Sequence, residues 1–174
     1  TRTVVRMAHA AGVGVEAELG HVGTGAEYQE MGAQRVGFTD PCTVAPYVEE
    51  TGVDVLAVAF GSAHGVYRGE PHLDLALLGD LRGCTDIPLA MHGGSGLSAE
   101  QFRGAIAAGV SKINIFTELG LTAGKRLCEH ATSEGASYFT FQTVIRDTFR
   151  ERCAEYLEVF GAAGRYPEGM RADG

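Results

Sequence analysis

A histidine followed by a glycine-rich turn is the part of the sequence best suited to chemistry. Residues 87–91 form a short apolar run typical of a buried strand, and His92 follows directly. The turn over residues 93–96 holds three glycines and a serine, and Ser98 with Gln101 predicts a capped helix start. Glycine lets backbone N–H groups approach a ligand, and a nearby helix N-terminus favours an anion. The pattern predicts a metal or acid–base group beside a phosphate pocket.

A second histidine occupies the equivalent place one strand–helix unit earlier. Residues 53–60 form another apolar run, and His64 follows it after a short turn. Neighbouring strands lie about 4.8 Å apart, so both imidazoles can reach one Zn²⁺ with bonds of about 2.0–2.1 Å. A catalytic zinc needs three protein ligands, and Glu18 and His21 are the nearest candidates for the third. The alternative for each ring alone is a histidine that only satisfies local hydrogen bonds.

Two carboxylates lie close together on the strand predicted over residues 13–19. Glu16 and Glu18 are two positions apart, so their side chains point to the same face of that strand. A buried pair of like charges is costly unless a cation or hydrogen-bond donors accompany it. We therefore expect both carboxylates to have partners at the interior or the mouth of the fold.

Two polar residues follow the strand predicted over residues 110–116. Asn114 and Thr117 come next along the chain from the glycine-rich turn. Their side-chain donors would complete a phosphate site begun by backbone N–H groups. The alternative for Thr117 is a helix N-cap, a position that threonine also favours.

The elements that must position these residues alternate along the chain. Strand patterns cover residues 13–19, 53–60, 87–91 and 110–116, and helix patterns cover residues 3–11, 40–50, 73–81, 99–108, 119–131 and 139–160. Four strand–helix alternations predict a parallel α/β fold, and right-handed crossovers place all strand ends on one face. A (β/α)₈ barrel carries its chemistry on that face. A doubly wound sheet is the alternative, although the sequence has no convincing GxGxxG fingerprint.

The predicted elements fit one domain over residues 1–174. We expect βα units over residues 1–118, C-terminal helices over residues 119–160 and a polar tail over residues 161–174. Residues 20–37 show no clear period and are predicted to form a long loop, a kind of segment that is often functional.

Composition limits the classes of function. Apolar residues make up 45% of the chain and charged residues 21%, which is typical of a soluble globular protein. The net charge of −8 argues against nucleic-acid binding and against a polybasic membrane role. No apolar run approaches the roughly 20 residues of a membrane span, and the first residues lack a signal-peptide pattern. We expect a cytoplasmic protein whose four widely spaced cysteines are reduced and mostly buried.

Four short motifs together point to a known family. They are Val15-Glu16-Ala17-Glu18-Leu19-Gly20, Gly61-Ser62-Ala63-His64-Gly65, His92-Gly93-Gly94-Ser95-Gly96 and Asn114-Ile115-Phe116-Thr117-Glu118. In this order and spacing they resemble the class II, zinc-dependent ketose-bisphosphate aldolases, which include fructose-1,6-bisphosphate and tagatose-1,6-bisphosphate aldolases. The resemblance covers nearly the whole chain. It implies a (β/α)₈ barrel and reversible cleavage of a ketose 1,6-bisphosphate to dihydroxyacetone phosphate and glyceraldehyde 3-phosphate.

The resemblance also implies roles for individual residues. His64 and His92 resemble two of the three zinc ligands, and Glu18 resembles a carboxylate that supports or alternately binds the metal. Glu27, in the loop over residues 20–37, is the candidate for proton transfer. A monovalent cation, Na⁺ or K⁺, is implied beside the phosphate. The residues that resemble the groups holding dihydroxyacetone phosphate are Gly65, Gly93, Ser95, Asn114 and Thr117.

The sequence departs from the family's pattern in one respect. The family's barrel has eight strands, whereas this chain supplies about four, which resemble the second half. The family's third zinc-binding histidine follows an aspartate on an early strand, and this sequence contains no Asp-His pair. We therefore expect a fragment, a truncated product or one part of a two-chain barrel, with weak zinc binding and little activity.

Assembly follows from the same resemblance. The family forms homo-oligomers, so we expect one here. The alternative function is a non-catalytic, sugar-phosphate-binding half-barrel that pairs with another chain through its open strand edges.

Overall fold

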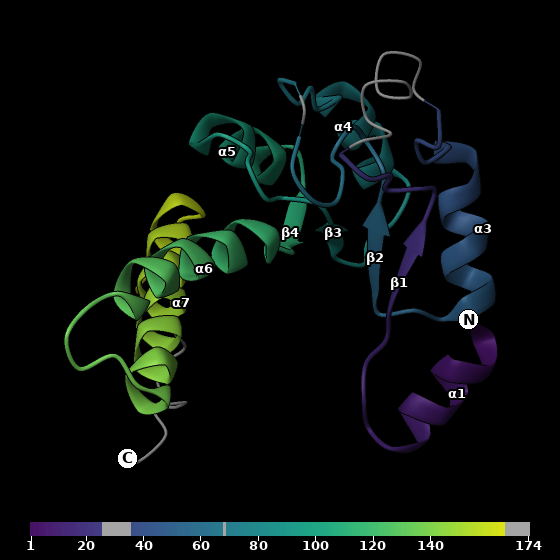
Figure 1. Ribbon diagram of the computed structural model, residues 1–174. Helices are drawn as coiled ribbons and strands as arrows, with labels where there is room; N and C mark the ends of the chain where they lie inside the picture. Colours follow the sequence, from purple (N-terminus) through teal and green to yellow (C-terminus); the bar gives the residue numbers. More distant parts are fainter. Residues whose placement is uncertain (26–35, 68, 166–174) are drawn as a thin grey trace. The chain divides into compact units, whose positions relative to one another are not determined.

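The computed structural model describes residues 1–25, 36–67 and 69–165 (Figure 1). The chain divides into two compact units, Thr1–Glu118 and Leu119–Gly174. The first unit contains all the strands named below and every described residue for which a site role is predicted.

A four-stranded parallel sheet forms the centre of the first unit. Its strands are β1 (Glu16–Leu19), β2 (Val55–Val58), β3 (Leu89–Met91) and β4 (Val110–Ile113), and they lie side by side in the order β1-β2-β3-β4. A doubly wound sheet reverses its strand order at a switch point, but the described sheet has no such reversal. The sequential order is that of consecutive units of a (β/α)₈ barrel, as predicted.

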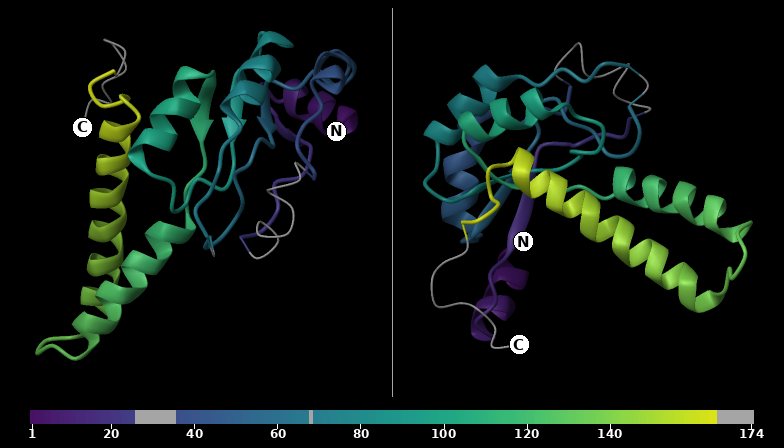
Figure 2. Two further views of the ribbon diagram at one scale, coloured as in Figure 1. Left: turned by 90° about the horizontal axis from the view of Figure 1, so that it is seen from above. Right: turned by 90° about the vertical axis from the view of Figure 1, so that its left-hand side faces the viewer.

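Helices cover one face of this sheet (Figures 1 and 2). Helices α3 (Pro41–Thr51), α4 (Leu75–Gly83) and α5 (Ala99–Ala107) follow β1, β2 and β3 in turn, and neighbouring helices contact each other. The predicted capping box at the start of α5 is confirmed, because the side chains of Ser98 and Gln101 each bond to the other's backbone N–H. A further helix, α1 (Arg2–Ala10), contacts α3.

The core lies between the sheet and these helices. Leu56, Ala57 and Val58 of β2 are fully buried, as are Leu89 and Met91 of β3. Consecutive side chains of these two strands point to opposite faces of the sheet and are buried alike, which explains why their sequences show no polar alternation. Burial of such side chains stabilises the fold by about 25 cal/mol for each Å² of apolar surface removed from water.

Two long helices form most of the described part of the second unit. Helix α6 (Thr117–Ala131) begins at the end of the first unit, and helix α7 (Tyr138–Val159) follows it. Arg126 Nη1 donates to Glu151 Oε2 at 2.6 Å, which joins the two helices. Thr148, which is 1% exposed, donates its hydroxyl to the backbone carbonyl of Val144.

Two expectations about single elements need correction. None of the four cysteines is buried: Cys42, Cys128 and Cys153 are exposed and Cys84 is half-buried, although all four are free thiols as expected. The three exposed cysteines lie on helices, where one face remains in solvent. The strand predicted over residues 110–116 ends at Ile113, so Asn114 and its neighbours belong to the turn that precedes α6.

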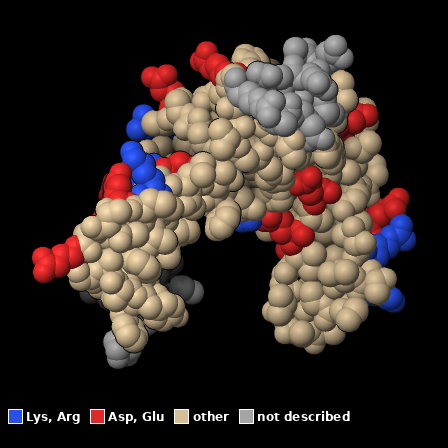
Figure 3. Space-filling view, in the orientation of Figure 1, with Lys and Arg blue, Asp and Glu red and all other residues tan. Residues whose placement is uncertain are grey.

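Charge is spread over the surface. Acidic side chains are distributed across the face shown in Figure 3, in line with the negative net charge. Within the described ranges, no helix combines the length and the apolar character needed to cross a bilayer.

Candidate functional site

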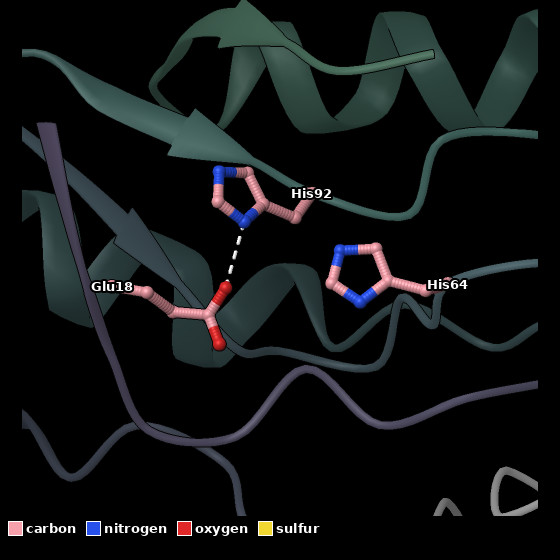
Figure 4. A group of neighbouring side chains, drawn as sticks. All are labelled: Glu18, His64 and His92. Carbon is pink, nitrogen blue, oxygen red and sulfur yellow. Dashed lines mark hydrogen bonds and ion pairs between the residues drawn. The ribbon is translucent and has the colours of Figure 1, made fainter. Parts of the chain in front are cut away.

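Glu18, His64 and His92 converge at the end of the sheet (Figure 4). One possible ligand atom from each side chain lies within 4.8 Å of the corresponding atoms of the other two. The two imidazole centroids are 5.8 Å apart, with the ring planes tilted by 40°. His92 Nδ1 lies 2.7 Å from Glu18 Oε2. The structure therefore brings together the three side chains for which sequence analysis predicted metal binding.

The three side chains come from neighbouring parts of the sheet. Glu18 lies in β1 and His92 directly follows β3, whereas His64 lies beyond the end of β2. The chain after β1 holds the His64 backbone from both sides: the N–H of His64 donates to the Gly23 carbonyl at 2.8 Å, and its carbonyl accepts from the Gly25 N–H at 2.7 Å. Parallel strands end at one edge, which is why residues far apart in sequence meet here.

Tyr67 joins the two histidine-bearing loops. Its hydroxyl accepts from the Ala63 N–H at 2.8 Å and donates to the Gly93 carbonyl at 2.8 Å. Gly93 has a φ of +72°, and a Cβ at this position would lie 2.4 Å from the carbonyl carbon and oxygen of Ala63. The loop after His92 thus needs glycine both for its backbone conformation and for close packing against the loop that carries His64.

The donor set fits a divalent metal of the zinc type. Two imidazoles and one carboxylate form a known ligand combination for catalytic zinc. Tetrahedral bonds of about 2.1 Å place donor atoms ~3.4 Å apart, so small side-chain movements would bring these atoms from their present separation to ligand distance. His21, the other candidate for a third ligand, does not belong to this cluster.

Glu16 and Lys112 support His92 from the other side. His92 Nε2 lies 2.9 Å from Glu16 Oε1. Lys112 Nζ donates to the same carboxylate, at 3.0 Å to Oε1 and 2.9 Å to Oε2. Partial burial raises the pKa of Glu16, but the hydrogen bonds from His92 and Lys112 outweigh this effect and hold that pKa below its ordinary value. The expectation that both carboxylates have partners is confirmed.

A pocket of about 490 Å³ opens beside His64. It brings together all five residues predicted to bind a sugar phosphate. The residues that line it are His64, Gly65, Gly93, Ser95, Ile113, Asn114, Ile115, Phe116 and Thr117. No lysine or arginine belongs to this set, so an anion here would be held by neutral donors and by the start of α6.

The polar residues of this pocket have defined places. Asn114 follows β4, and its carbonyl accepts from the Gly94 N–H at 3.2 Å. The buried Ser95 hydroxyl oxygen accepts from the Glu118 N–H at 3.2 Å, which ties the glycine-rich turn to the first turn of α6. These two hydrogen bonds hold together the two loops that border the pocket.

Sequence patterns did not predict the roles of several site residues. Tyr67 and Lys112 have no motif of their own, and only their contacts reveal a role. Phe116 lines the pocket and is 72% exposed, a position that its apolar character did not predict. Glu27, the candidate for proton transfer, lies outside the described residues.

The fold and the site define a parallel α/β protein with a candidate metal cluster at the carboxyl edge of its sheet. The chain belongs to the class II fructose-bisphosphate aldolase family: residues 1–165 match the family described as "Fructose-bisphosphate aldolase class-II". The match spans all four named strands and the whole of both long helices.

Individual relatives support this membership. The chain is 40% identical over 167 residues to a fructose-bisphosphate aldolase of Geobacillus stearothermophilus and 39% identical over 165 residues to the Escherichia coli protein YdjI. In both cases the match covers 95% of this chain and 58% of the relative. The chain therefore spans little more than half the length of these relatives.

Solved structures give the same result. The crystal structure of the YdjI aldolase from Escherichia coli K12 matches with a TM-score of 0.79 and 34% identity, over 95% of this chain and 56% of that one. A putative fructose-1,6-bisphosphate aldolase from Coccidioides immitis shares the fold, with a TM-score of 0.80 at 23% identity. The partial coverage agrees with a fold that is part of a barrel.

Proposed function

We propose that this chain carries the metal- and phosphate-binding part of a class II aldolase site. The reaction would be reversible cleavage of a ketose 1,6-bisphosphate, of fructose or tagatose type, to dihydroxyacetone phosphate and glyceraldehyde 3-phosphate. The observation that carries the proposal is the convergence of Glu18, His64 and His92 beside a pocket lined by the five expected phosphate-binding residues. Family membership supports it, but the chain matches only part of its relatives' length.

Each group has a separate task in this proposal. Glu18, His64 and His92 would hold the metal, with zinc as the expected ion. A bound zinc would supply a Lewis acid that polarises the ketose carbonyl and favours negative charge on its oxygen. Gly65, Gly93 and the turn that follows would hold the phosphate through backbone N–H groups.

The remaining groups would orient the substrate and move its protons. Asn114 and Thr117 would direct the hydroxyl and phosphate groups of the dihydroxyacetone phosphate portion. A monovalent cation beside the phosphate would offset charge that the pocket's neutral lining leaves uncompensated. Glu27 would transfer the proton as acid or base.

The test is release of triose phosphate by the purified 174-residue chain. Zinc is added with fructose 1,6-bisphosphate or tagatose 1,6-bisphosphate, and a parallel sample contains a chelator. We expect slow release that the chelator abolishes and that His64→Ala reduces by at least about tenfold, or 1.4 kcal/mol in transition-state free energy. Release that is unaffected by both the chelator and His64→Ala would refute a metal-dependent aldolase.

A second candidate function is a non-catalytic half-barrel that binds sugar phosphate and pairs with another chain. It is favoured by the positions of β1 and β4, which lie at the two ends of the described sheet and pair on one side only. Binding of zinc and of dihydroxyacetone phosphate without any turnover would favour this candidate over the first.

A further inference from the structure

His92 is held at both of its ring nitrogens by carboxylates. Nδ1 lies 2.7 Å from Glu18 Oε2, and Nε2 lies 2.9 Å from Glu16 Oε1. The His92 side chain is only 17% exposed. The two carboxylates therefore constrain how this partly buried ring can rotate, although only Glu18 belongs to the candidate metal cluster.

Lys112 holds the Glu16 carboxylate in place. Its ammonium group lies within 3.0 Å of both carboxylate oxygens. Glu16 stands on β1 and Lys112 on β4, whereas His92 follows β3. The contact network thus crosses the sheet, and its geometry depends on the register of strands rather than on a flexible loop.

A carboxylate at Nε2 determines which nitrogen of His92 is available to a metal. A neutral imidazole that gives one nitrogen to a metal keeps its proton on the other. An ionised carboxylate only accepts hydrogen bonds, so Glu16 favours the proton on Nε2. Glu18 favours a proton on Nδ1 in the same way, but a metal bound between Nδ1 and Glu18 would displace that proton (Figure 4). Glu16 lies outside the metal cluster, so the proton on Nε2 would remain and the lone pair of Nδ1 would be free for the metal.

We propose that Glu16, fixed by Lys112, is a positioning residue that sets the tautomer of His92 and directs its Nδ1 towards a metal held with Glu18 and His64. The inference rests on the proposed function, because it requires a metal in that cluster. Carboxylates that accept the distal N–H of a metal-bound imidazole typically change metal affinity by about 10–100-fold when they are removed.

The first measurement is the zinc dissociation constant of the full chain, by competition with a chromophoric chelator. We expect Glu16→Ala to weaken zinc binding by about 10–100-fold. Glu16→Gln keeps an acceptor for the Nε2 proton and should recover part of the loss. Lys112→Met should weaken binding in the same direction but less, because Glu16 remains.

The matched control is Glu50→Ala. Glu50 is an exposed glutamate on α3 whose carboxylate pairs with Arg2 at 2.6 Å, so the variant also breaks an ion pair but lies outside the metal cluster. Its zinc dissociation constant should equal that of the unmodified chain. Circular dichroism checks that each variant folds. If Glu16→Ala does not fold, Lys112→Met provides the test, because the Lys112 side chain is half-exposed and its replacement disturbs little packing.

The second measurement is the His92 tautomer in the zinc-loaded protein, by long-range ¹H–¹⁵N NMR. We expect Nδ1 bound and Nε2 protonated in the unmodified chain, with both tautomers populated in Glu16→Ala. Zinc on Nε2, or unchanged affinity in every folded Glu16 and Lys112 variant, would overturn the positioning role alone. Failure of the unmodified chain to bind zinc would overturn the metal site and, with it, both proposals.

Discussion

At the scale of single residues, two glycines of the pocket differ in what they require. Gly93 and Gly65 both have positive φ, at +72° and +89°. A Cβ on Gly93 would overlap the Ala63 backbone, whereas a Cβ on Gly65 would meet no heavy atom within 4 Å. Close packing therefore adds to the conformational requirement only at Gly93.

This difference predicts unequal effects of alanine. Gly65→Ala should lower the free energy of unfolding by about 1 kcal/mol, the lower end of the range for a left-handed residue. Gly93→Ala adds an overlap with the Ala63 backbone. Because the backbone must shift, this overlap should lower the free energy of unfolding by a further ~1–3 kcal/mol. Urea unfolding of both variants measures the difference. Equal losses of unfolding free energy in the two variants would show that close packing between the loop after His92 and the loop that carries His64 does not restrict residue 93.

At the scale of elements, Asp54 joins α1 to the beginnings of two strands. Its Oδ2 accepts from the Val15 N–H at 2.6 Å and lies 2.9 Å from His9 Nε2. His9 lies on α1, and this helix places its ring beside the Asp54 carboxylate. The hydrogen bond from His9, followed by that from Val15, lowers the pKa of Asp54 below its ordinary value of 3.8.

The lowered pKa predicts a pH dependence of stability. A carboxyl group whose pKa is lower in the folded state stabilises the fold above its unfolded pKa, and this contribution is lost as pH falls through the folded value. Asp54→Asn should therefore unfold at a lower temperature than the unmodified chain near neutral pH, and the difference should shrink in acid below pH 3.8. Thermal unfolding followed by circular dichroism at several pH values measures it. A difference that is constant across this range would contradict the role assigned to Asp54.

At the scale of the whole molecule, the described sheet ends at β1 and β4. Unpaired strand edges favour pairing with another chain. We expect the chain to self-associate, with a sedimentation coefficient that rises with protein concentration. A single monomeric species over an about hundredfold range of protein concentration would contradict this expectation.

The sequence by itself determined the elements and the edge at which the site lies. Apolar runs, caps and glycine turns are local patterns, and the strands and helices they predicted are present with shifted ends. The order of strand, histidine and glycine turn also placed His64 and His92 at one edge, because parallel strands end together. Four motifs were enough to indicate the family, since each records a local arrangement of backbone and side chain.

Only the tertiary structure decided which side chains meet across that edge. Lys112 and His92 both contact Glu16, although they follow it by 96 and 76 positions in the chain. Likewise, Tyr67 joins two loops although no motif marks it. Such contacts join residues of different strands and loops, so they depend on how those segments are placed in space, which a motif within one segment does not specify.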